Sequence, residues 1–554
     1  IRDIVRTWQD ALRDAAHDEG ADPALIAIAS HFPGSYRGTF SPKVALRDAA
    51  EIGRITEENP IAADFHRHPH QPTTHGALKI YHYGAPVALS RRVPILENMG
   101  FRVISERTFE IPTTGGVVFV HDMEIQSAHD APLDLSNDGA LFEEVFLSVW
   151  RGTSDNDGYN ALAHRAGFTS ADITILRAYG HYLQQAGIPQ SQDFIAAVLA
   201  RHPAITKNLR ELFFARLDPA RVDTAGKNED ARSIEVEIEA ELDDVPNIDE
   251  DTIIRRFLNL VHNTLRTNHF APVTDGKPRS LALKLDSKSV DGLPEPRPWR
   301  EIFVFGPEIE GVHLRFGPVA RGGLRWSDRA QDYRTEVLGL VKAQQVKNAV
   351  IVPVGAKGGF YPKQLPSGGS RDVIFEAGRN AYINFVSSLL SVTDNLHGAK
   401  VAPPENVVRH DGDDPYFVVA ADKGTATFSD TANAISQNHD FWLDDAFASG
   451  GSAGYDHKKM GITARGAWEA VKRHFREMNR DIQTEPFTVV GVGDMSGDVF
   501  GNGMLLSKQT RLIAAFDHRD IFIDPDPDAA SSFAERQRMF NLPRSSWQDY
   551  DKSK

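Results

Sequence analysis

The spacing of apolar residues changes several times along the chain, and each change predicts a different kind of element. Residues 1–60 show helical spacing that is broken at HFPGS and EENP. After residue 76 a short strand pattern leads into an amphipathic helix closed by Gly100. FRVISERTFEI and VVFVHDMEI then alternate as two strands across the turn TTGG. The βαββ order predicts an α+β region at residues 76–135.

Helical spacing returns between about residues 138 and 270. Ile175, Tyr179 and Tyr182 share one helix face, and an aromatic stripe of this kind is typical of a core rather than of a cofactor site. The acidic run SIEVEIEAELDDVPNIDEDT predicts a solvated surface. These patterns predict a helical domain without chemistry of its own.

The pattern becomes α/β near residue 300. EIFVFGPEIEGVHLRFG alternates and ends in GPVARGGLRWSD, and the helix DYRTEVLGLVKAQQVKN then places Gln344 and Lys347 on one face. The continuous apolar run at residues 349–354 predicts a buried strand, with Lys357 just past its carboxyl end. A second strand in PYFVVAADKG puts Asp422 at the equivalent place. Open α/β sheets bind their ligands at such strand ends.

Glycines surround the lysine of VGAKGG. Gly355, Gly358 and Gly359 carry no Cβ, which predicts that substrate and backbone can approach the amine closely. The string is not a phosphate loop, because that signature needs Ser or Thr directly after the lysine. Two structural alternatives stay open: the polar helix face is a surface edge, and Lys357 with Asp422 is a salt bridge that ties two strand ends.

The segment EPFTVVGVGDMSGDVFG reads as a strand followed by glycines that open a helix, and LIAAFDHRD follows as a second strand ending in acid. Gly491 and Gly493 would let a pyrophosphate meet the backbone and the helix amino terminus. Ser496 stands at the third fingerprint position, so we expect looser packing of helix on strand. Asp517 would accept hydrogen bonds from an adenosine ribose and repel a 2′-phosphate, which favours NAD over NADP.

Composition narrows the class of protein. A chain of 554 residues, 41% apolar and 25% charged, predicts several globular domains. Its formal charge of -15 argues against non-specific binding to nucleic acid or to an anionic membrane. The lack of cysteine excludes disulfides and a thiol nucleophile and fits a reducing cytoplasm. Without a long apolar run or a signal peptide, we expect a soluble cytoplasmic protein.

The stretch DFHRHPHQPTTH concentrates histidines before the α+β region. Its prolines and the lack of an ordered acid favour a solvated loop over a metal site, so we predict no metal. The histidines concerned are His66, His68, His70 and His75.

Five motifs together resemble, in this order, those of the large bacterial NAD-specific glutamate dehydrogenases: GPVARGGLRWSD, VKN, VGAKGG, ADKGTATFSD and GVGDMSGDVFG. The resemblance covers the whole chain and implies an α/β multidomain protein in which ACT-like and helical regions precede an α/β catalytic domain and the start of a Rossmann domain. The regions we expect are a helical segment (1–75), the ACT-like region (76–135), a helical domain (136–275), the catalytic domain (276–435), connecting helices (436–485) and a partial Rossmann domain (486–554).

The resemblance implies oxidative deamination of L-glutamate to 2-oxoglutarate and ammonium, with hydride transfer to NAD. Lys357 matches the catalytic lysine that activates water, and Asp422 matches the acid that moves protons to and from the substrate nitrogen. The positions matched to substrate binding are Arg321, Gln344, Lys347, Gly323 and Gly358. The positions matched to cofactor binding are Gly491, Gly493, Ser496, Asp517 and Thr463.

The chain departs from the family pattern at two positions. Smaller relatives carry lysine where this chain has Arg321, and Ala464 replaces a glycine beside Thr463. Two other functions stay open: a dehydrogenase for another L-amino acid, and a non-catalytic module whose ACT-like region senses an amino-acid effector. Analogy with the superfamily predicts a homo-oligomer, with a tetramer favoured. The chain stops soon after the second Rossmann strand, so this fragment could be inactive alone.

Overall fold

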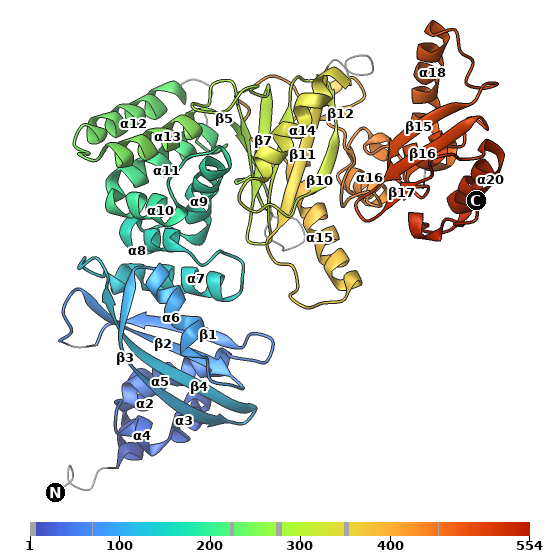
Figure 1. The fold of residues 1–554 in the computed structure, drawn as a ribbon. Coiled ribbons are helices and arrows are strands. Elements are labelled where there is room, and N and C mark those ends of the chain that lie inside the picture. The colour runs from blue at the N-terminus through green and yellow to red at the C-terminus, as the bar shows by residue number, and fades with distance from the viewer. Residues whose placement is uncertain (1–6, 69, 222–226, 273–279, 348–353, 453) are drawn as a thin grey trace, which may run out of the picture. The chain divides into compact units, whose positions relative to one another are not determined.

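The computed structural model describes residues 7–554 apart from 69, 222–226, 273–279, 348–353 and 453, and it leaves out the side chains of 227–228, 346–347 and 457–458. The chain forms two compact units (Figure 1). The first comprises Ile1–Ala426 with Ala434–Phe447, and the second comprises Thr427–Asn433 with Ala448–Lys554. Both combine helices with sheets, which confirms the α/β class.

The N-terminal part of the first unit is a four-stranded antiparallel sheet in the order β1-β2-β4-β3. The strands are β1 (Ile61–His66), β2 (His75–Tyr83), β3 (Phe101–Thr113) and β4 (Gly116–Ser127), and α6 (Leu89–Asn98) joins β2 to β3. Gly100, with a φ of 83°, ends this connection as predicted. The strand β1 was not predicted, because the histidine-rich end of its sequence reads as loop.

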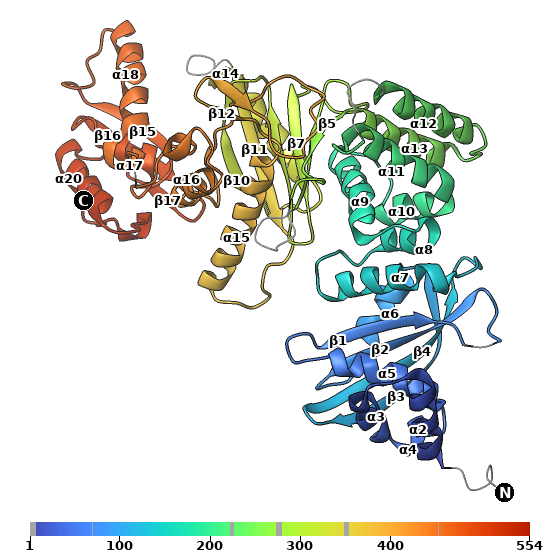
Figure 2. The ribbon, with the colours of Figure 1, turned by 180° about the vertical axis from the view of Figure 1, so that it is seen from behind.

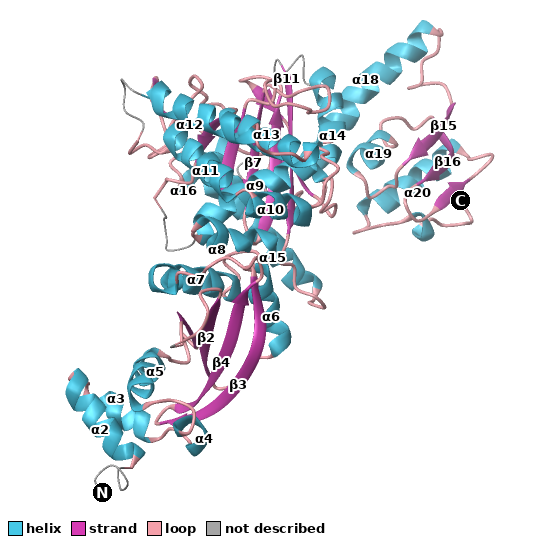
Figure 3. Ribbon diagram, turned by 90° about the vertical axis from the view of Figure 1, so that its left-hand side faces the viewer, coloured by secondary structure: helices cyan, strands magenta, loops and turns pink. Residues whose placement is uncertain are grey.

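Helices cover both faces of this sheet (Figure 3). The N-terminal helices pack on one face, where Tyr81, Val118 and Val120 join their core. They are α2 (Trp8–Glu19), α3 (Pro23–Ser30), α4 (Gly34–Arg37) and α5 (Pro42–Arg54). On the opposite face Leu78 and Ile125 are buried in a core shared with α6 and the following helix. The alternation of the strands therefore buries apolar residues on both sides.

Seven α-helices follow in the described part of the chain and form the predicted helical region. They are α7 (Leu135–Trp150), α8 (Leu162–Ala166), α9 (Ser170–Gln185), α10 (Gln192–Arg201), α11 (Pro203–Leu217), α12 (Lys227–Leu242) and α13 (Ile248–His262). A capping box between Thr169 and Asp172 starts α9. The aromatic stripe on α9 is core, because Tyr179 and Tyr182 are fully buried. The acidic run forms parts of α12 and α13.

An eight-stranded sheet with α14 (Tyr333–Lys347) and α15 (Arg371–Leu390) completes the first unit (Figure 2). The strand order is β14-β10-β11-β8-β7-β6-β5, with β9 paired to β11. Bounds are β5 (Thr264–Thr267), β6 (Leu281–Leu285), β7 (Arg300–Phe305), β8 (Ile309–Arg315), β9 (Ala320–Arg321), β10 (Gly323–Trp326), β11 (Val354–Pro362) and β14 (Ala420–Ala421). A small hairpin pairs β12 (Asn395–His397) with β13 (Lys400–Ala402).

The position of Lys357 differs from the prediction. The strand expected at 349–354 lies outside the described residues except for Val354, and β11 begins there and runs to Pro362. Lys357 therefore lies inside a strand, not beyond its end. The glycines around it read as a loop in the sequence because they lack side chains to pack, yet here they sit in the middle of a sheet. Asp422 directly follows β14, as predicted.

The second unit holds a three-stranded sheet in the order β15-β16-β17. Strands β15 (Phe487–Val492) and β16 (Thr510–Phe516) are parallel and are joined through α19 (Asp498–Gly503), which is the predicted start of a Rossmann fold. Antiparallel β17 (Ile521–Ile523) follows. The remaining helices are α17 (His457–Met460), α18 (Ile462–Glu477) and α20 (Ala529–Asn541), and α16 (Ser429–Asn438) has residues in both units.

None of the described helices combines the length and the apolar character needed to cross a membrane. The region boundaries given above stay predictions.

Candidate active site

Lys357 lies on the sheet face that α14 covers. Alternate residues of a strand point to the same face, so Lys357 shares its face with Gly355 and Gly359. A Cβ at Gly355 would lie 2.6 Å from the Cβ of Gln344, and a Cβ at Gly359 would lie 2.5 Å from Val337 Cγ2. Both neighbours belong to α14. The helix thus lies directly on the strand at both sides of the lysine.

This close packing gives the glycines around Lys357 a structural role, and their role in the approach of a substrate stays a prediction. On the opposite face, a Cβ at Gly358 would collide with Leu324 and would come within 2.9 Å of His313. The places where side chains would stand are filled by protein atoms rather than open to a ligand. Gly355 and Gly359 therefore allow β11 and α14 to pack closely, and Gly358 makes room for Leu324 and His313 on the opposite face.

The amine of Lys357 is buried and paired. Lys357 is 6% exposed and its Nζ forms an ion pair with Asp422 Oδ2. Arg325, on β10 between the two, places its Nε 3.2 Å from the same oxygen and its Nη1 2.9 Å from Glu336 Oε1 on α14. Ser327 Oγ donates to the second oxygen of Glu336 at 2.7 Å. Two cations and two carboxylates thus form a chain from the strand to the helix.

The charge of Asp422 is set by these neighbours. Burial raises the pKa of Asp422, but hydrogen bonds from Lys357 and Arg325 outweigh burial and hold the pKa below its ordinary value. The carboxylate is therefore ionised at neutral pH. Its side chain keeps 19% of its surface exposed, whereas that of Lys357 keeps 7%. A ligand or a water molecule can reach the acid more easily than the base.

A tight turn holds Asp422 in place. The Asp422 amide donates to Thr425 Oγ1 at 3.0 Å, and that hydroxyl donates to the carbonyl of Leu324 on β10 at 2.7 Å. Gly424 has a φ of 83°, and a Cβ there would meet Trp326 at 2.7 Å. Gly323 allows the same approach, since a Cβ would lie 3.1 Å from Asp422 Cβ. Gly323 therefore supports the position of the acid by its lack of a side chain.

The predicted substrate-binding cations lie on elements next to Lys357. Arg321 on β9 pairs in register with Gly355 of β11, so it points to the face of Lys357 and is half-buried there. Gln344 lies over Gly355 and is also half-buried. Lys347 ends α14, but its side chain lies outside the described set. The structure thus brings Lys357, Asp422, Arg321 and Gln344 to one side of the sheet.

Sequence reasoning missed Arg325 and Glu336. Both contact the ionised groups of this cluster, and Arg325 contacts Asp422 directly. A signal was available, because Arg321 and Arg325 are four residues apart in GPVARGGLRWSD. In an extended chain, residues separated by an even number of positions point to the same face, so Arg325 should point to the face of Arg321. The glycines between them made this alternation hard to recognise in the sequence.

In the second unit, the glycines of the predicted fingerprint pack against a phenylalanine. A Cβ at Gly491 would lie 2.5 Å from the Phe500 ring, and a Cβ at Gly493, with a φ of 136°, would lie 2.9 Å from Phe500 Cβ. The Gly493 amide donates to the carbonyl of Phe516 at 2.8 Å, which joins the glycine loop to the end of β16. These glycines make room for the Phe500 side chain of α19, and the looser packing expected from Ser496 stays a prediction.

Asp517 directly follows β16, where the sequence predicts the acid that would bind the ribose of NAD. Asp517 Oδ1 accepts hydrogen bonds from the backbone amides of Arg519 at 2.7 Å and Asp520 at 2.8 Å. The hydrogen bond from Arg519 contributes most to lowering the pKa of Asp517. Its Oδ2 is buried and accepts no hydrogen bond from a described N–H group, and the side chain of Asp494 also contributes to lowering the pKa of Asp517. A buried carboxylate oxygen of this kind is suited to accept a hydrogen bond from a hydroxyl group of a ligand.

Two other cofactor candidates have local roles. The amide and the hydroxyl of Ser496 both donate to Asp494 Oδ1, at 2.7 Å and 2.6 Å, so this residue shapes the loop before α19. Thr463 is an exposed residue in the first turn of α18, and its match to a cofactor-binding position stays a prediction. The helix there begins after Gly461, whose φ of 60° provides the break in direction.

Comparison with known families matches three successive parts of the chain. Residues 60–137 match the model described as glutamate dehydrogenase, ACT3 domain, and residues 154–219 match glutamate dehydrogenase, helical motif 3. Residues 237–554 match bacterial NAD-glutamate dehydrogenase, catalytic domain. The last match contains both the Lys357 cluster and the glycine loop.

Similar proteins from several bacteria cover nearly the whole chain. NAD-specific glutamate dehydrogenases of Halomonas elongata and Pseudomonas aeruginosa are 50% and 49% identical over 99% of this chain, and 34% of each relative is covered. That of Mycobacterium tuberculosis is 51% identical over 100% of this chain and 35% of the relative. The chain therefore spans about a third of the length of the curated relatives it matches. Since the catalytic-domain model matches more than half of its residues, the chain belongs to the bacterial NAD-glutamate dehydrogenase family.

Proposed function

We propose that the complete protein oxidises L-glutamate to 2-oxoglutarate and ammonium with NAD. The observation that carries this proposal is the buried amine of Lys357 beside the ionised carboxylate of Asp422, on the sheet face that also holds Arg321. Oxidative deamination needs a base, a proton carrier and cations for carboxylates within one shielded site. Family membership supports the same reaction.

The cations of the site would bind and orient the substrate. A guanidinium matches the geometry of a carboxylate, and Arg321 is half-buried and lies near the base, so it is suited to hold one substrate carboxylate. Gln344 on α14 would donate to the same ligand from the helix side. Burial under α14 excludes water and strengthens these interactions.

Lys357 and Asp422 would move the protons. In the deprotonated form, Lys357 would accept a proton from the water that attacks the iminium carbon of the oxidised substrate. The C–O bond forms as that O–H bond breaks, and the π electrons of the C=N bond move to the nitrogen. Asp422, which is closer to solvent, would take a proton from the substrate nitrogen and return one as ammonium leaves. Arg325 would hold Asp422 ionised between these transfers.

The second unit supplies residues that fit the adenosine end of NAD, which when bound would supply the hydride acceptor. The buried Oδ2 of Asp517 stands beside the glycine loop, where a ribose hydroxyl could donate a hydrogen bond to it. A 2′-phosphate would meet the negative charge of the same carboxylate, which favours NAD. The amino-acid effector and the tetramer stay predictions from the resemblance.

The test is glutamate-dependent formation of NADH by the complete protein carrying Lys357→Met. Methionine keeps much of the side-chain volume but removes the base, so we expect kcat to fall about 10³-fold. Lys342→Met is the matched control, because Lys342 is an exposed lysine of α14 and should leave kcat unchanged. Thermal melting of both variants checks folding. Wild-type turnover in folded Lys357→Met would refute the proposed role.

A further inference from the structure

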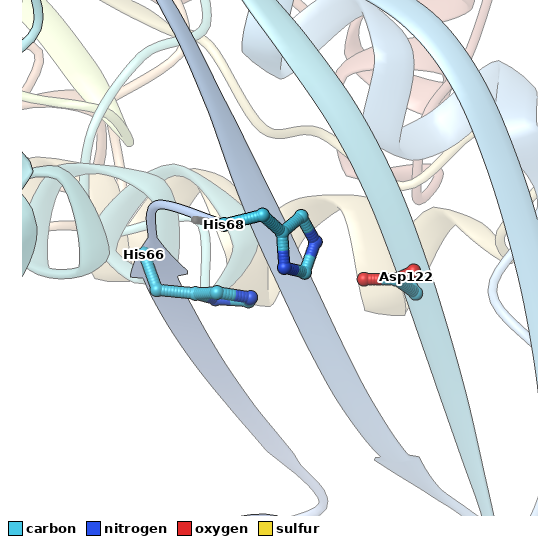
Figure 4. Close-up of side chains that lie close together, drawn as sticks. All are labelled: His66, His68 and Asp122. Carbon is cyan, nitrogen blue, oxygen red and sulfur yellow. The ribbon is translucent and has the colours of Figure 1, made fainter. Parts of the chain in front are cut away.

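Three potential metal ligands meet on the ACT-like sheet. His66 at the end of β1, His68 in the next loop and Asp122 on β4 each offer one ligand atom, and these atoms lie within 4.8 Å of one another. Figure 4 shows the ring of His68 placed between His66 and the carboxylate of Asp122. All three side chains are half-buried, so the prediction of a solvated loop is wrong for these two histidines.

The sheet register brings the ligands together. His66 pairs with Ala77 of β2, and Lys79, two residues further along β2, pairs with Asp122 of β4. Paired and alternate residues share a face, so His66, Ala77 and Asp122 point to the same side. On β2, Ala77 stands opposite His66 and carries only a methyl group, whereas Lys79, on the same face, stands opposite Asp122. The fold therefore brings Asp122, which is far from the histidines in the sequence, to their side of the sheet.

His66 is already oriented as metal ligands usually are. Its Nδ1 lies 3.2 Å from Asp64 Oδ2 and 3.3 Å from the Asp64 carbonyl. A proton on Nδ1 donated to these oxygens leaves the lone pair of Nε2 for a metal, as in carboxylate–histidine–metal groups. The ring of His68 packs edge-on against that of His66, with centroids 5.0 Å apart.

The carboxylate of Asp122 lacks a partner that a cation would supply. Asp122 Oδ1 is buried without a hydrogen-bond partner among the described residues. Lys79 does not fill that place, because its amine is 2.6 Å from Asp48 Oδ2 and 3.9 Å from the centroid of the Phe40 ring.

The surrounding charges favour a divalent cation. The ligands and their charged neighbours include four carboxylates and two cations, so negative charge exceeds positive charge around the site. These groups are Asp48, Asp64, Asp122, Glu124, Lys79 and Arg47.

We propose that His66, His68 and Asp122 bind a divalent transition-metal ion of the Zn²⁺ class, with one coordination position open to water. Two imidazoles and one carboxylate select such a metal over Mg²⁺ or Ca²⁺, which prefer oxygen ligands. By coordinating all three side chains, the ion would cross-link the loop that carries His68 to strands β1 and β4. It therefore stabilises the ACT-like region, independently of the reaction at Lys357.

The test is calorimetric titration of the chelator-treated complete protein with Zn²⁺, together with Co²⁺ as a spectroscopic probe. We expect one ion per chain at this site, and a Co²⁺ absorption spectrum typical of nitrogen and oxygen ligands. His68→Ala and Asp122→Asn should each weaken binding at least about 10-fold. His70→Ala is the matched control, because His70 is an exposed histidine of the same loop and should not change binding.

A second measurement keeps the proposal open to refutation if one variant folds poorly. Added Zn²⁺ should raise the melting temperature of the wild-type and His70→Ala proteins, but not that of His68→Ala, whose change lies in a loop. Binding that survives both His68→Ala and Asp122→Asn would place the ion elsewhere and overturn the proposal. A wild-type protein that takes up no Zn²⁺ would overturn it as well.

Discussion

Two groups of buried charges in the first unit are built from the same residue types but differ in exposure. The Arg266 network consists of Arg266, Lys284, Arg315, Asp394, Asp411 and Asp414, and no side chain in it is more than 5% exposed. The Lys357 cluster consists of Lys357, Arg325, Asp422 and Glu336, and its arginine and its aspartate are each 19% exposed. The first network is closed to solvent, and the second is open at one side.

Geometry explains the difference. Arg266 on β5 binds Asp394 with two nitrogens, at 2.9 Å and 3.1 Å, and places Nε 2.6 Å from Asp411. Lys284 on β6 reaches Asp414 at 2.8 Å. The core strands β5 and β6 thereby hold the segment after α15 that carries Asp394, Asp411 and Asp414. Protonation of one of these carboxylates would leave a buried cation without its partner. The Lys357 cluster can exchange protons at Asp422, so the same chemistry can serve a reaction.

Arg266→Met should have the largest effect on stability. Removing one partner of a buried ionic network leaves Asp394 and Asp411 as uncompensated charges, which costs about 3–5 kcal/mol. Urea unfolding should show this loss, while kcat per folded molecule stays near the wild-type value. Arg409→Met is the control, because Arg409 also contacts Asp394 but is 27% exposed, and it should cost only about 0–1 kcal/mol. Equal stability of Arg266→Met and wild type would remove the contrast between the two groups.

Asp422→Asn should reverse this pattern. The amide cannot carry the proton, so kcat should fall about 10²-fold. Stability should change by only about 1 kcal/mol, because the pair is partly exposed. Steady-state kinetics and urea unfolding of the complete protein measure the two effects separately. If Asp422→Asn lost stability as Arg266→Met does and kept its kcat, the Lys357 cluster would be a structural tie between strands.

The sequence predicts those parts of the fold that depend on local spacing. The helix at 333–347, the turn before β4 and the acid after β16 follow from periodicity and turn residues, and the structure has all three. Register and packing between distant segments leave no such local signal. Lys357 inside β11 is the example, because the glycines beside it are explained only by Gln344 and Val337 of α14.

The candidate sites show the same limit. The sequence names Lys357 and Asp422 through motifs, but Arg325 becomes evident only when β10 lies between them. Asp64 contacts His66 from within the histidine segment, but the third ligand, Asp122, comes close to His66 and His68 only through the pairing of β1, β2 and β4. Residues far apart in the chain are joined by the sheet, and a single sequence contains no direct record of that pairing.

The smallest of the three effects is a pH dependence that distinguishes the two groups of charges. Burial raises the pKa of Asp414, but Arg315 and Lys284 outweigh burial and lower it from 3.8 to about 2. Because the folded pKa is depressed, the stabilisation is fully present above the unfolded pKa and is lost as the pH falls from about 4 towards 2, which amounts to about 2 kcal/mol. Urea midpoints of wild type and Asp414→Asn should therefore converge over this range. Asp422 is more exposed, so the urea midpoints of wild type and Asp422→Asn should converge less over the same pH range. Equal convergence of both variants with wild type would show that exposure does not separate the two groups of charges.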